Sequence, residues 1–322
     1  MINLNCIIDG NYLLHRHVHT LHKNNLLYGA LENSLDIAIS NYRKWFPFTN
    51  IYFVSDTKKK SWRHKLYKDY KAKRNRDSDI DWGFVFDTYI SFKEKLNDKK
   101  IKLFELDHIE GDDWVTFIVQ ESNKKGQSNL IVSNDYDIKQ ILNFQLDPAI
   151  INFMTNEVFG KQKFFLPKNY QVFLTKIKGN LKESIFDIDD DSDFLNYIKS
   201  IQEKHEIVET DSVQSLLLKV ISGDASDNIK SVLGPAQGTK KGIGIVGAKT
   251  ILEMYKQEFG DPVLNDPDLF ENIADLICEK KKINRSQISK ISDNIRKNME
   301  LINLEVNNLP TEVIQRMKTL SI

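Results

Sequence analysis

The sequence predicts an α/β fold in which a mostly parallel sheet flanked by helices is followed by a mostly helical C-terminal region. Between residues 4 and 137, four apolar runs of strand length alternate with segments of helical period. Continuous apolar strands that alternate with helices are typical of a parallel sheet covered on both faces. The alternation ends near a hairpin expected over Ile150–Phe165, and mostly helical sequence continues from there to the C-terminus.

Each strand-like run leads directly to acidic residues. The runs are LNCIID, NIYFVSD, KLFELDHIEGDD and NLIVSNDYD, and the acids that they reach are Asp9, Asp56, Glu110, Asp112, Asp113, Asp135 and Asp137. Helices are expected between the runs over Leu31–Trp45, Val85–Leu96 and Trp114–Glu121. In open parallel sheets, ligands bind in the crevice outside the carboxyl ends of the strands. The four acidic groups are therefore predicted to face one crevice.

Two further aspartates follow an apolar helical run, Leu216–Ile221. They are Asp224 and Asp227 in the stretch SGDASDNI. Aspartate side chains bond nearby backbone amides, so turn or cap roles are one interpretation. The other interpretation is that both carboxylates join the acids of the sheet around a cation.

A third acidic stretch, DIDDDSD at residues 187–193, resembles a calcium-binding loop. However, Ser192 stands where such a loop needs glycine, and Ile198 stands where it needs glutamate. We therefore exclude a calcium site, and capping of the expected helix Phe194–Lys204 accounts for the loop.

The composition is that of an ordinary globular protein. The chain has 322 residues, 41% hydrophobic and 28% charged, which is enough for one large domain or two small ones. No apolar stretch approaches the roughly 18 residues of a membrane span, and the N-terminus lacks the pattern of a signal peptide. Cys6 and Cys278 are the only cysteines, which excludes a disulfide framework and a thiolate zinc site. A cytoplasmic protein is expected.

Positive charge is concentrated in one segment, although the net charge of the chain is zero. Ten Lys or Arg residues and one acid, Asp69, lie between Lys58 and Arg76. A solvated helix face usually mixes both signs, so this one-sided charge favours contact with a polyanion.

The acids, taken as one set, indicate a site for divalent cations. Carboxylates that converge on a single crevice repel one another unless cations lie among them. Oxygen ligands without His or Cys favour Mg²⁺ or Mn²⁺ over zinc. Two such ions can activate water on one side of a phosphodiester and stabilise the leaving oxygen on the other.

Six motifs in order resemble the flap endonuclease / 5′-nuclease superfamily, over about residues 3 to 310. This superfamily includes the 5′-nuclease domain of bacterial DNA polymerase I and the phage 5′-exonucleases, also called phage ribonuclease H. The motifs are IIDGNYLLHR, VSDTKKKSWRHKLYKDYKAKR, IEGDDW, VSNDYDIKQIL, SGDASDNI with GIGIVGAKTIL, and ISDNIRKNMELINLEV. The resemblance implies a PIN-like (resolvase-like) nuclease domain over residues 1–180, with an arch and basic segment at about 58–98. It also implies a helical region over 181–322 that carries a helix-hairpin-helix at about 220–260.

The resemblance implies a role for each matching residue. Asp9, Asp56, Glu110 and Asp112 match the ligands of a first metal, Asp135, Asp137 and Asp224 match those of a second, and Asp113 and Asp227 match supporting positions. Lys71 and Arg74 match basic residues that contact the scissile phosphate. Nucleic-acid contacts are implied for His15, Arg16, Arg63, Lys240, Lys241, Gly242, Gly244, Gly247 and Lys249. The implied cofactors are two Mg²⁺ ions, replaceable by Mn²⁺, and K⁺ at the helix-hairpin-helix.

Four features depart from the family or allow a second interpretation. His15 stands where relatives carry Phe or Tyr for base stacking, and residues 233–241 lengthen the link to the hairpin. His15, His17 and His19 alternate, but at helical spacing they do not share one face, which disfavours a metal triplet. Gly242, Gly244 and Gly247 form GxGxxG, but no strand precedes them, so a phosphate-binding hairpin is favoured over a dinucleotide site.

The resulting hypothesis is a metal-dependent 5′-nuclease that acts on 5′ flaps, nicked or gapped DNA and RNA–DNA hybrids, and removes primers or flaps during replication. A bacterial or phage-infected cytoplasm and a monomer are expected, and a sliding clamp or single-strand-binding protein stays open as a partner. Two alternatives are a PIN-type ribonuclease and a branched-DNA-binding protein without catalysis. The complete acidic set favours catalysis.

Overall fold

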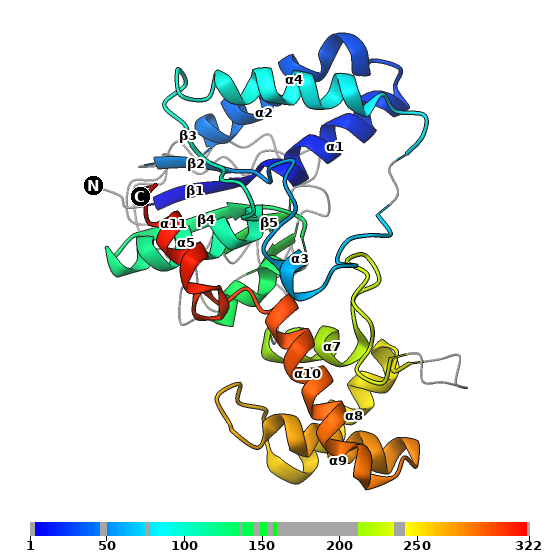
Figure 1. Cartoon of the computed structure of the whole chain (residues 1–322). Coiled ribbons are helices and arrows are strands. Elements are labelled where there is room, and N and C mark those ends of the chain that lie inside the picture. The colour runs from blue at the N-terminus through cyan, green and yellow to red at the C-terminus, as the bar shows by residue number, and fades with distance from the viewer. Residues whose placement is uncertain are drawn as a thin grey trace. The chain divides into compact units, whose positions relative to one another are not determined.

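The computed structural model describes residues 4–45, 50–74, 77–135, 137–143, 149–152, 157–159, 212–234 and 242–320. A sheet occupies the N-terminal part, and in the described residues its strands follow the order β3-β2-β1-β4-β5-β6 (Figure 1). The strands are β1 (Leu4–Asp9), β2 (Asn50–Val54), β3 (Lys102–Phe104), β4 (Ser128–Val132), β5 (Ala149–Asn152) and β6 (Glu157–Phe159). The neighbours from β3 to β5 are parallel, and β6 pairs antiparallel with β5. The predicted mostly parallel sheet is confirmed.

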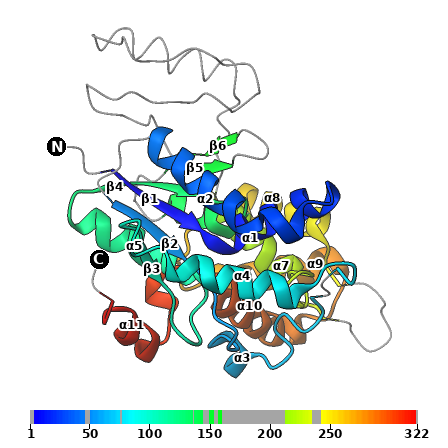
Figure 2. The same cartoon turned by 90° about the horizontal axis from the view of Figure 1, so that it is seen from above.

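Helices cover both faces of this sheet. The helices α1 (Gly10–Lys23), α2 (Leu27–Trp45) and α4 (Trp82–Glu94) lie on one face, and α5 (Gly111–Lys124) lies on the other (Figures 1 and 2). In β1, Cys6 and Ile8 pack into the core beneath α1, α2 and α4, and Ile7 between them is also fully buried. Burial of both sets of side chains explains why the strand is continuously apolar.

Local capping sets where two helices begin. The helix α4 starts at Trp82 because the Asp81 carboxylate accepts a hydrogen bond from the Phe84 amide at 3.1 Å. The helix α5 starts at Gly111, three residues before the apolar stretch that predicted it, because Glu110 and Asp113 form a reciprocal capping box. Sequence periodicity detects the apolar face of a helix and misses its polar first turn.

The C-terminal part is helical. Its elements are α7 (Ser212–Ser222), α8 (Ile245–Phe259), α9 (Leu269–Lys281), η2 (Arg285–Gln287), α10 (Ile288–Ile302) and η3 (Val306–Asn308). The helix α10 packs on both α7 and α9, and these helices share one apolar core. The side-chain amide of Asn298 on α10 donates hydrogen bonds to the carbonyls of Val220 and Lys230, at 2.8 and 2.9 Å. This amide therefore satisfies backbone groups at the C-terminal end of α7 and after it.

The chain forms two compact units. The sheet unit comprises 1–59, 77–210 and 310–322, and the helical unit comprises 60–76 and 211–309. The sheet unit also contains η1 (Asp137–Asn143) and α11 (Thr311–Met317), whereas α3 (Arg63–Leu66) belongs to the helical unit.

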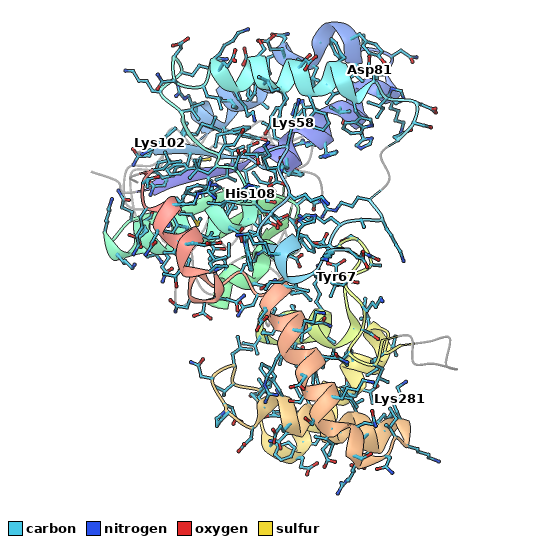
Figure 3. All side chains as sticks on the ribbon, in the orientation of Figure 1. Lys58, Tyr67, Asp81, Lys102, His108 and Lys281 are labelled. Atoms are coloured by element: carbon cyan, nitrogen blue, oxygen red, sulfur yellow. The ribbon has the colours of Figure 1, made fainter. Side chains whose placement is uncertain are left out.

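Most of the basic segment belongs to the helical unit, which differs from its predicted place in the nuclease domain. The reason is packing: Tyr70 is buried in the helical core, and Tyr67 packs against that core with its ring 5.3 Å from the Lys297 ammonium (Figure 3). The predicted boundary at 180/181, the loop at 187–193 and Lys240 and Lys241 lie outside the described residues. Among the helices that the structure describes, none has the length and apolar character needed to cross a bilayer.

Candidate functional site

The carboxyl ends of β1 and β4 bring two of the predicted acids close together. Strand order reverses direction between these neighbouring strands, which is where open α/β sheets bind ligands. Asp9, the last residue of β1, caps α1 by accepting the Tyr12 amide at 3.0 Å. Its second oxygen accepts the Ser133 hydroxyl at 2.7 Å, and the same hydroxyl oxygen accepts the Asp135 amide at 3.0 Å. Ser133 therefore links Asp9 to the loop that carries Asp135.

The environment of Asp9 resists its ionisation. Burial raises the pKa of its carboxyl to about 6, and the charges of Asp135 and Asp56 act in the same direction. The hydrogen bonds from Tyr12 and Ser133 oppose this rise but do not cancel it. Three carboxylates from the ends of three parallel strands thus interact electrostatically. A divalent cation would relieve this repulsion, so the donor set fits a metal that prefers oxygen ligands.

The N-terminus of α5 supplies a second group of acids. The Gly111 amide donates a hydrogen bond to the Asp56 carboxylate at 2.6 Å, so the end of β2 is tied to the start of α5. A β-carbon at Gly111 would lie 3.3 Å from the same Asp56 oxygen, so a larger residue there would require the Asp56 side chain to shift by a few tenths of an ångström. Asp112 is half-buried in the first turn of α5. The positive end of the helix dipole favours all these carboxylates.

Asp113 has a different environment from its neighbours. Its side chain is fully buried and accepts the Glu110 amide at 3.1 Å. The Glu110 side chain accepts the Asp113 amide in return. This geometry fits the predicted supporting position, because Asp113 fixes the backbone from which Glu110 projects.

The loop after β4 carries the last two acids of the sheet unit. Asp135 is exposed, and its carboxylate accepts the amide of Asp137 at 2.8 Å. Within the described ranges, no three His, Cys, Asp or Glu side chains are placed so that they could hold a metal ion together. The assignment of the acids to two metal ions therefore stays a prediction.

Asp224 anchors its own turn in the helical unit. Its carboxylate accepts the Lys219 ammonium at 2.8 Å and, through its other oxygen, the amide and hydroxyl of Ser226 at 2.8 and 2.6 Å. Burial opposes ionisation, but these donors outweigh it and lower the pKa of Asp224 to about 2. These hydrogen bonds support the turn interpretation of Asp224. Its carboxylate stays charged and forms an ion pair with the Lys219 ammonium.

Lys71 and Arg74, the predicted phosphate contacts, lie on the basic segment next to the Asp224–Asp227 turn. Lys71 is half-buried, with its ammonium 5.0 Å from the centre of the Tyr70 ring. Arg74 is exposed and forms an ion pair with Asp227 at 2.6 Å. Both belong to the helical unit, as do Asp224 and Asp227.

Arg63 is inside the helical unit and not on its surface. The residue is 1% exposed, its guanidinium lies 4.5 Å from the Trp62 ring centre, and its Nε donates to the Leu301 carbonyl at 2.9 Å. This burial is at odds with the predicted nucleic-acid contact. A buried guanidinium that satisfies a backbone carbonyl has a structural role.

The remaining predicted contacts lie on two helices. On α1, His15 is exposed and its ring centre lies 5.3 Å from that of Trp82 and 6.1 Å from that of His19. The side chain of Arg16 is partly buried. His17 faces Ser34 instead, at 2.5 Å, so the three histidines do not share one face, as expected.

The hairpin glycines precede and begin α8. Gly244 is the N-cap residue of α8, and Gly247 and Lys249 lie in its first turns. A β-carbon at Gly242 would lie 2.0 Å from the Ser231 hydroxyl, which itself accepts the Ile243 amide at 3.1 Å. Gly242 is therefore needed for close approach of the hairpin to the turn after Asp227.

Two residues that contact the predicted acids were not predicted from the sequence. Ser133 bridges Asp9 and the Asp135 loop, and the Tyr70 hydroxyl donates to Asp227 at 2.9 Å. Ser133 could have been found as the first polar residue after β4, and Tyr70 as the first residue of the YKAKR ending. Lys58 and His108 follow β2 and β3, so they also lie at the carboxyl edge of the sheet, where the acids are (Figure 3).

The raised pKa of Asp9 predicts an unusual effect of pH on stability. Between its ordinary value of 3.8 and about 6, the folded metal-free protein keeps a proton that the unfolded chain releases, so its stability falls as pH rises. Asp9→Asn should therefore raise the free energy of unfolding in EDTA at pH 8 by about 1–3 kcal/mol, and by much less at pH 4. Urea titrations at both pH values measure this. Asp81→Asn, an exposed helix cap, is the control, and an equal gain at both pH values would contradict the assignment.

Known proteins resemble the chain over most of its length. Residues 5–167 match the family described as 5′-3′ exonuclease, N-terminal resolvase-like domain. A 5′-3′ exonuclease of Mycoplasmopsis pulmonis is 26% identical over 292 residues, which are 89% of this chain and 74% of that protein. A 5′-3′ exonuclease of Buchnera aphidicola is 28% identical over 160 residues, so the match spans 54% of that relative and 49% of this chain.

A solved structure shares the fold along the whole chain. It is that of the bacteriophage T5 flap endonuclease in a pseudo-enzyme–product complex with DNA and metal ions. The likeness has a TM-score of 0.58 at 17% identity, and it covers 98% of this chain and 97% of that one. The expected combination of a resolvase-like sheet domain with a helical C-terminal region is thus found in a known fold.

Proposed function

This chain belongs to the family of 5′-3′ exonucleases with an N-terminal resolvase-like domain, and from that premise we propose that it is a divalent-metal-dependent, structure-specific 5′-nuclease. Membership confirms the predicted family and the prediction of a nuclease. The proposed substrates are 5′ flaps, nicks and gaps in DNA and the RNA of RNA–DNA hybrids. The proposed role is the removal of primers or flaps during replication.

One observation carries the proposal of metal dependence: at the carboxyl edge of the sheet, Asp9 is buried and the charges of Asp56 and Asp135 both add to the rise of its pKa. Burial of Asp9 makes a neighbouring cation favourable. We propose that the metal ligands of the sheet unit are Asp9, Asp56, Glu110, Asp112, Asp135 and Asp137, with Asp113 behind Glu110. For Asp224, in the helical unit, the role of a metal ligand stays a prediction. Bound Mg²⁺ or Mn²⁺ would supply the activation of water and the stabilisation of the leaving oxygen.

The chain's own residues would hold the strand that is cut. Lys71 and Arg74 offer cationic groups for a phosphate, where developing negative charge is stabilised most by preorganised donors. Gly244 caps α8 and Gly247 lies in its first turn, so the N-terminus of this helix, next to Gly242, is proposed to bind a phosphate of the duplex. Lys249 is exposed in the same helix, and His15 is exposed on α1. The predicted K⁺ would lie at this hairpin.

Cleavage of end-labelled substrates tests the proposal. We expect a 5′-flap duplex to be cut in Mg²⁺ near the junction, and free single-stranded RNA of the same length to be cut far more slowly. Equal cutting of free single-stranded RNA would favour the PIN-type ribonuclease instead. Binding of the flap without any cutting would favour a branched-DNA-binding protein. The Mycoplasmopsis pulmonis relative is named a 5′-3′ exonuclease, which supports a nuclease over a binding protein.

The cellular setting follows from the proposed reaction. Flaps and primers arise where DNA is replicated, so we propose that the enzyme acts in the cytoplasm of a bacterium or of a phage-infected host. We also propose that it acts as a monomer. A sliding clamp or single-strand-binding protein stays open as a partner, and pull-down with each purified protein would identify it.

A further inference from the structure

Asp227 connects two segments of the helical unit that are far apart in the sequence. Its two carboxylate oxygens accept separate hydrogen bonds, one from the Tyr70 hydroxyl at 2.9 Å and one from the Arg74 guanidinium at 2.6 Å. Its backbone carbonyl accepts the Lys71 amide at 2.8 Å. The carboxylate is 12% exposed, whereas the Arg74 side chain is 53% exposed. Asp227 thus forms hydrogen bonds with three residues of the basic segment, Tyr70, Lys71 and Arg74.

The turn around Asp227 is itself rigidly built. Asp224 and Ile229 exchange backbone hydrogen bonds at 2.9 and 2.7 Å, which closes the turn. Gly223 has a φ of 76°, and a β-carbon there would lie 2.5 Å from the Ile229 carbonyl oxygen. Next to Asp227, the side-chain amide of Asn228 donates to the Asp69 carbonyl at 2.8 Å. The turn therefore offers a fixed platform for residues 69–74.

This platform determines the conformation of Lys71. Its φ is 56°, in the left-handed region that side chains other than glycine, asparagine and aspartate rarely adopt. Such a conformation persists where the surrounding structure fixes it. Here the buried Tyr70 and the bond from the Lys71 amide to the Asp227 carbonyl fix the backbone before the Lys71 α-carbon, and the bond from the Arg74 amide to the Lys71 carbonyl at 3.2 Å fixes it after.

We propose that Asp227 is a positioning residue for Lys71 and Arg74, and that it does not act as a metal ligand. The inference rests on the proposed function in one respect, namely that Lys71 and Arg74 meet a phosphate. The contacts of Asp227 support it, because a cation on this carboxylate would stand beside the guanidinium charge that lies 2.6 Å from Oδ1. Asp224 differs, since its carboxylate accepts hydrogen bonds from Lys219, Ser226 and the Asp227 amide, which all lie on α7 or in the turn that follows it.

A double-mutant cycle tests the coupling. Asp227→Asn and Tyr70→Phe should each lower the single-turnover cleavage rate of a flap substrate, Asp227→Asn by about ten- to a hundredfold. The double variant should lose about as much as Asp227→Asn alone, because both changes release the same segment. The slope of binding against salt should fall toward that of Lys71→Ala, a change that general destabilisation would not produce.

Two further measurements separate positioning from metal binding. The rise in melting temperature on addition of Mn²⁺ should stay at the wild-type value in Asp227→Asn and shrink in Asp135→Asn. Hydrogen exchange at the Lys71 amide should speed up at least about tenfold in Asp227→Asn under native conditions. The matched control is Asp266→Asn, which weakens another tyrosine–aspartate bond of the helical unit, Tyr255 to Asp266 at 3.4 Å. It should change neither the salt slope nor exchange at Lys71.

Several results would overturn the inference. Rate losses that multiply in the double variant would show that Asp227 and Tyr70 act independently, which rejects the shared positioning role. A Mn²⁺-induced stabilisation that shrinks in Asp227→Asn would make Asp227 a metal ligand. Unchanged exchange at Lys71 in a folded Asp227→Asn protein would also reject it. These outcomes differ from failure of the proposed function, because in that case wild-type protein would not cut the flap, while exchange at Lys71 would still respond to Asp227→Asn.

Discussion

Removal of divalent metal with EDTA should abolish cleavage of a 5′-flap substrate and leave binding to the junction largely intact. The acids at the sheet edge would hold the cation that the cleavage step needs. Most of the affinity for DNA would come from phosphate contacts by basic side chains and backbone amides. Without a cation, Asp9 is held near a pKa of about 6 by burial and by its neighbours, so part of its charge is lost in mildly acidic solution. At sub-saturating Mg²⁺, cleavage should therefore fall as pH drops below about 6, because protons then compete with the cation for the Asp9 carboxylate.

The measurement pairs a cleavage assay with fluorescence anisotropy on one labelled flap, in Mg²⁺ and in EDTA. Asp135→Asn in Mg²⁺ should reproduce the EDTA result, and Asp266→Asn should behave as wild type. If EDTA reduced binding and cleavage by the same factor, the cation would be holding the DNA and not only the reacting water.

Lys71→Ala should lower the cleavage rate by about two to three orders of magnitude, because a positive donor is lost where negative charge builds during attack on the phosphate. The ammonium lies over the Tyr70 ring at 5.0 Å, so its direction is already restricted before DNA binds. As a phosphate contact it should also contribute to affinity, and the slope of log binding constant against log salt should fall by roughly one unit.

Asp56→Ala should be equally damaging to cleavage but should leave the salt slope unchanged, or tighten binding by removing a negative charge. Asp56 accepts the Gly111 amide at 2.6 Å at the sheet edge and is proposed to meet the metal and not the DNA. Lys281→Ala removes one exposed positive charge at the end of α9 and serves as the charge control (Figure 3). Cleavage at the wild-type rate by Lys71→Ala would show that the YKAKR ending does not meet the scissile phosphate.

The sequence by itself determined the fold class and the edge of the sheet at which the acids gather. Both depend on local signals: apolar runs make strands, and the residue that follows a parallel strand must lie at its carboxyl end. Asp9, Asp56, Glu110 and Asp135 could therefore be placed without coordinates. Lys71 and Arg74 came instead from the resemblance of the YKAKR ending to the family, and their contact with a phosphate stays a prediction.

Only the tertiary structure decided what several polar residues contact, because their partners are distant in sequence. Arg63 bonds a carbonyl 238 residues away, and Tyr70 bonds Asp227 across 157 residues. No periodicity or charge count encodes such pairs, so Arg63 had the same interpretation as the exposed lysines beside it. The basic segment likewise joined the helical unit because Tyr70 is buried in its core, a choice that depends on packing between segments and not on the composition of either one.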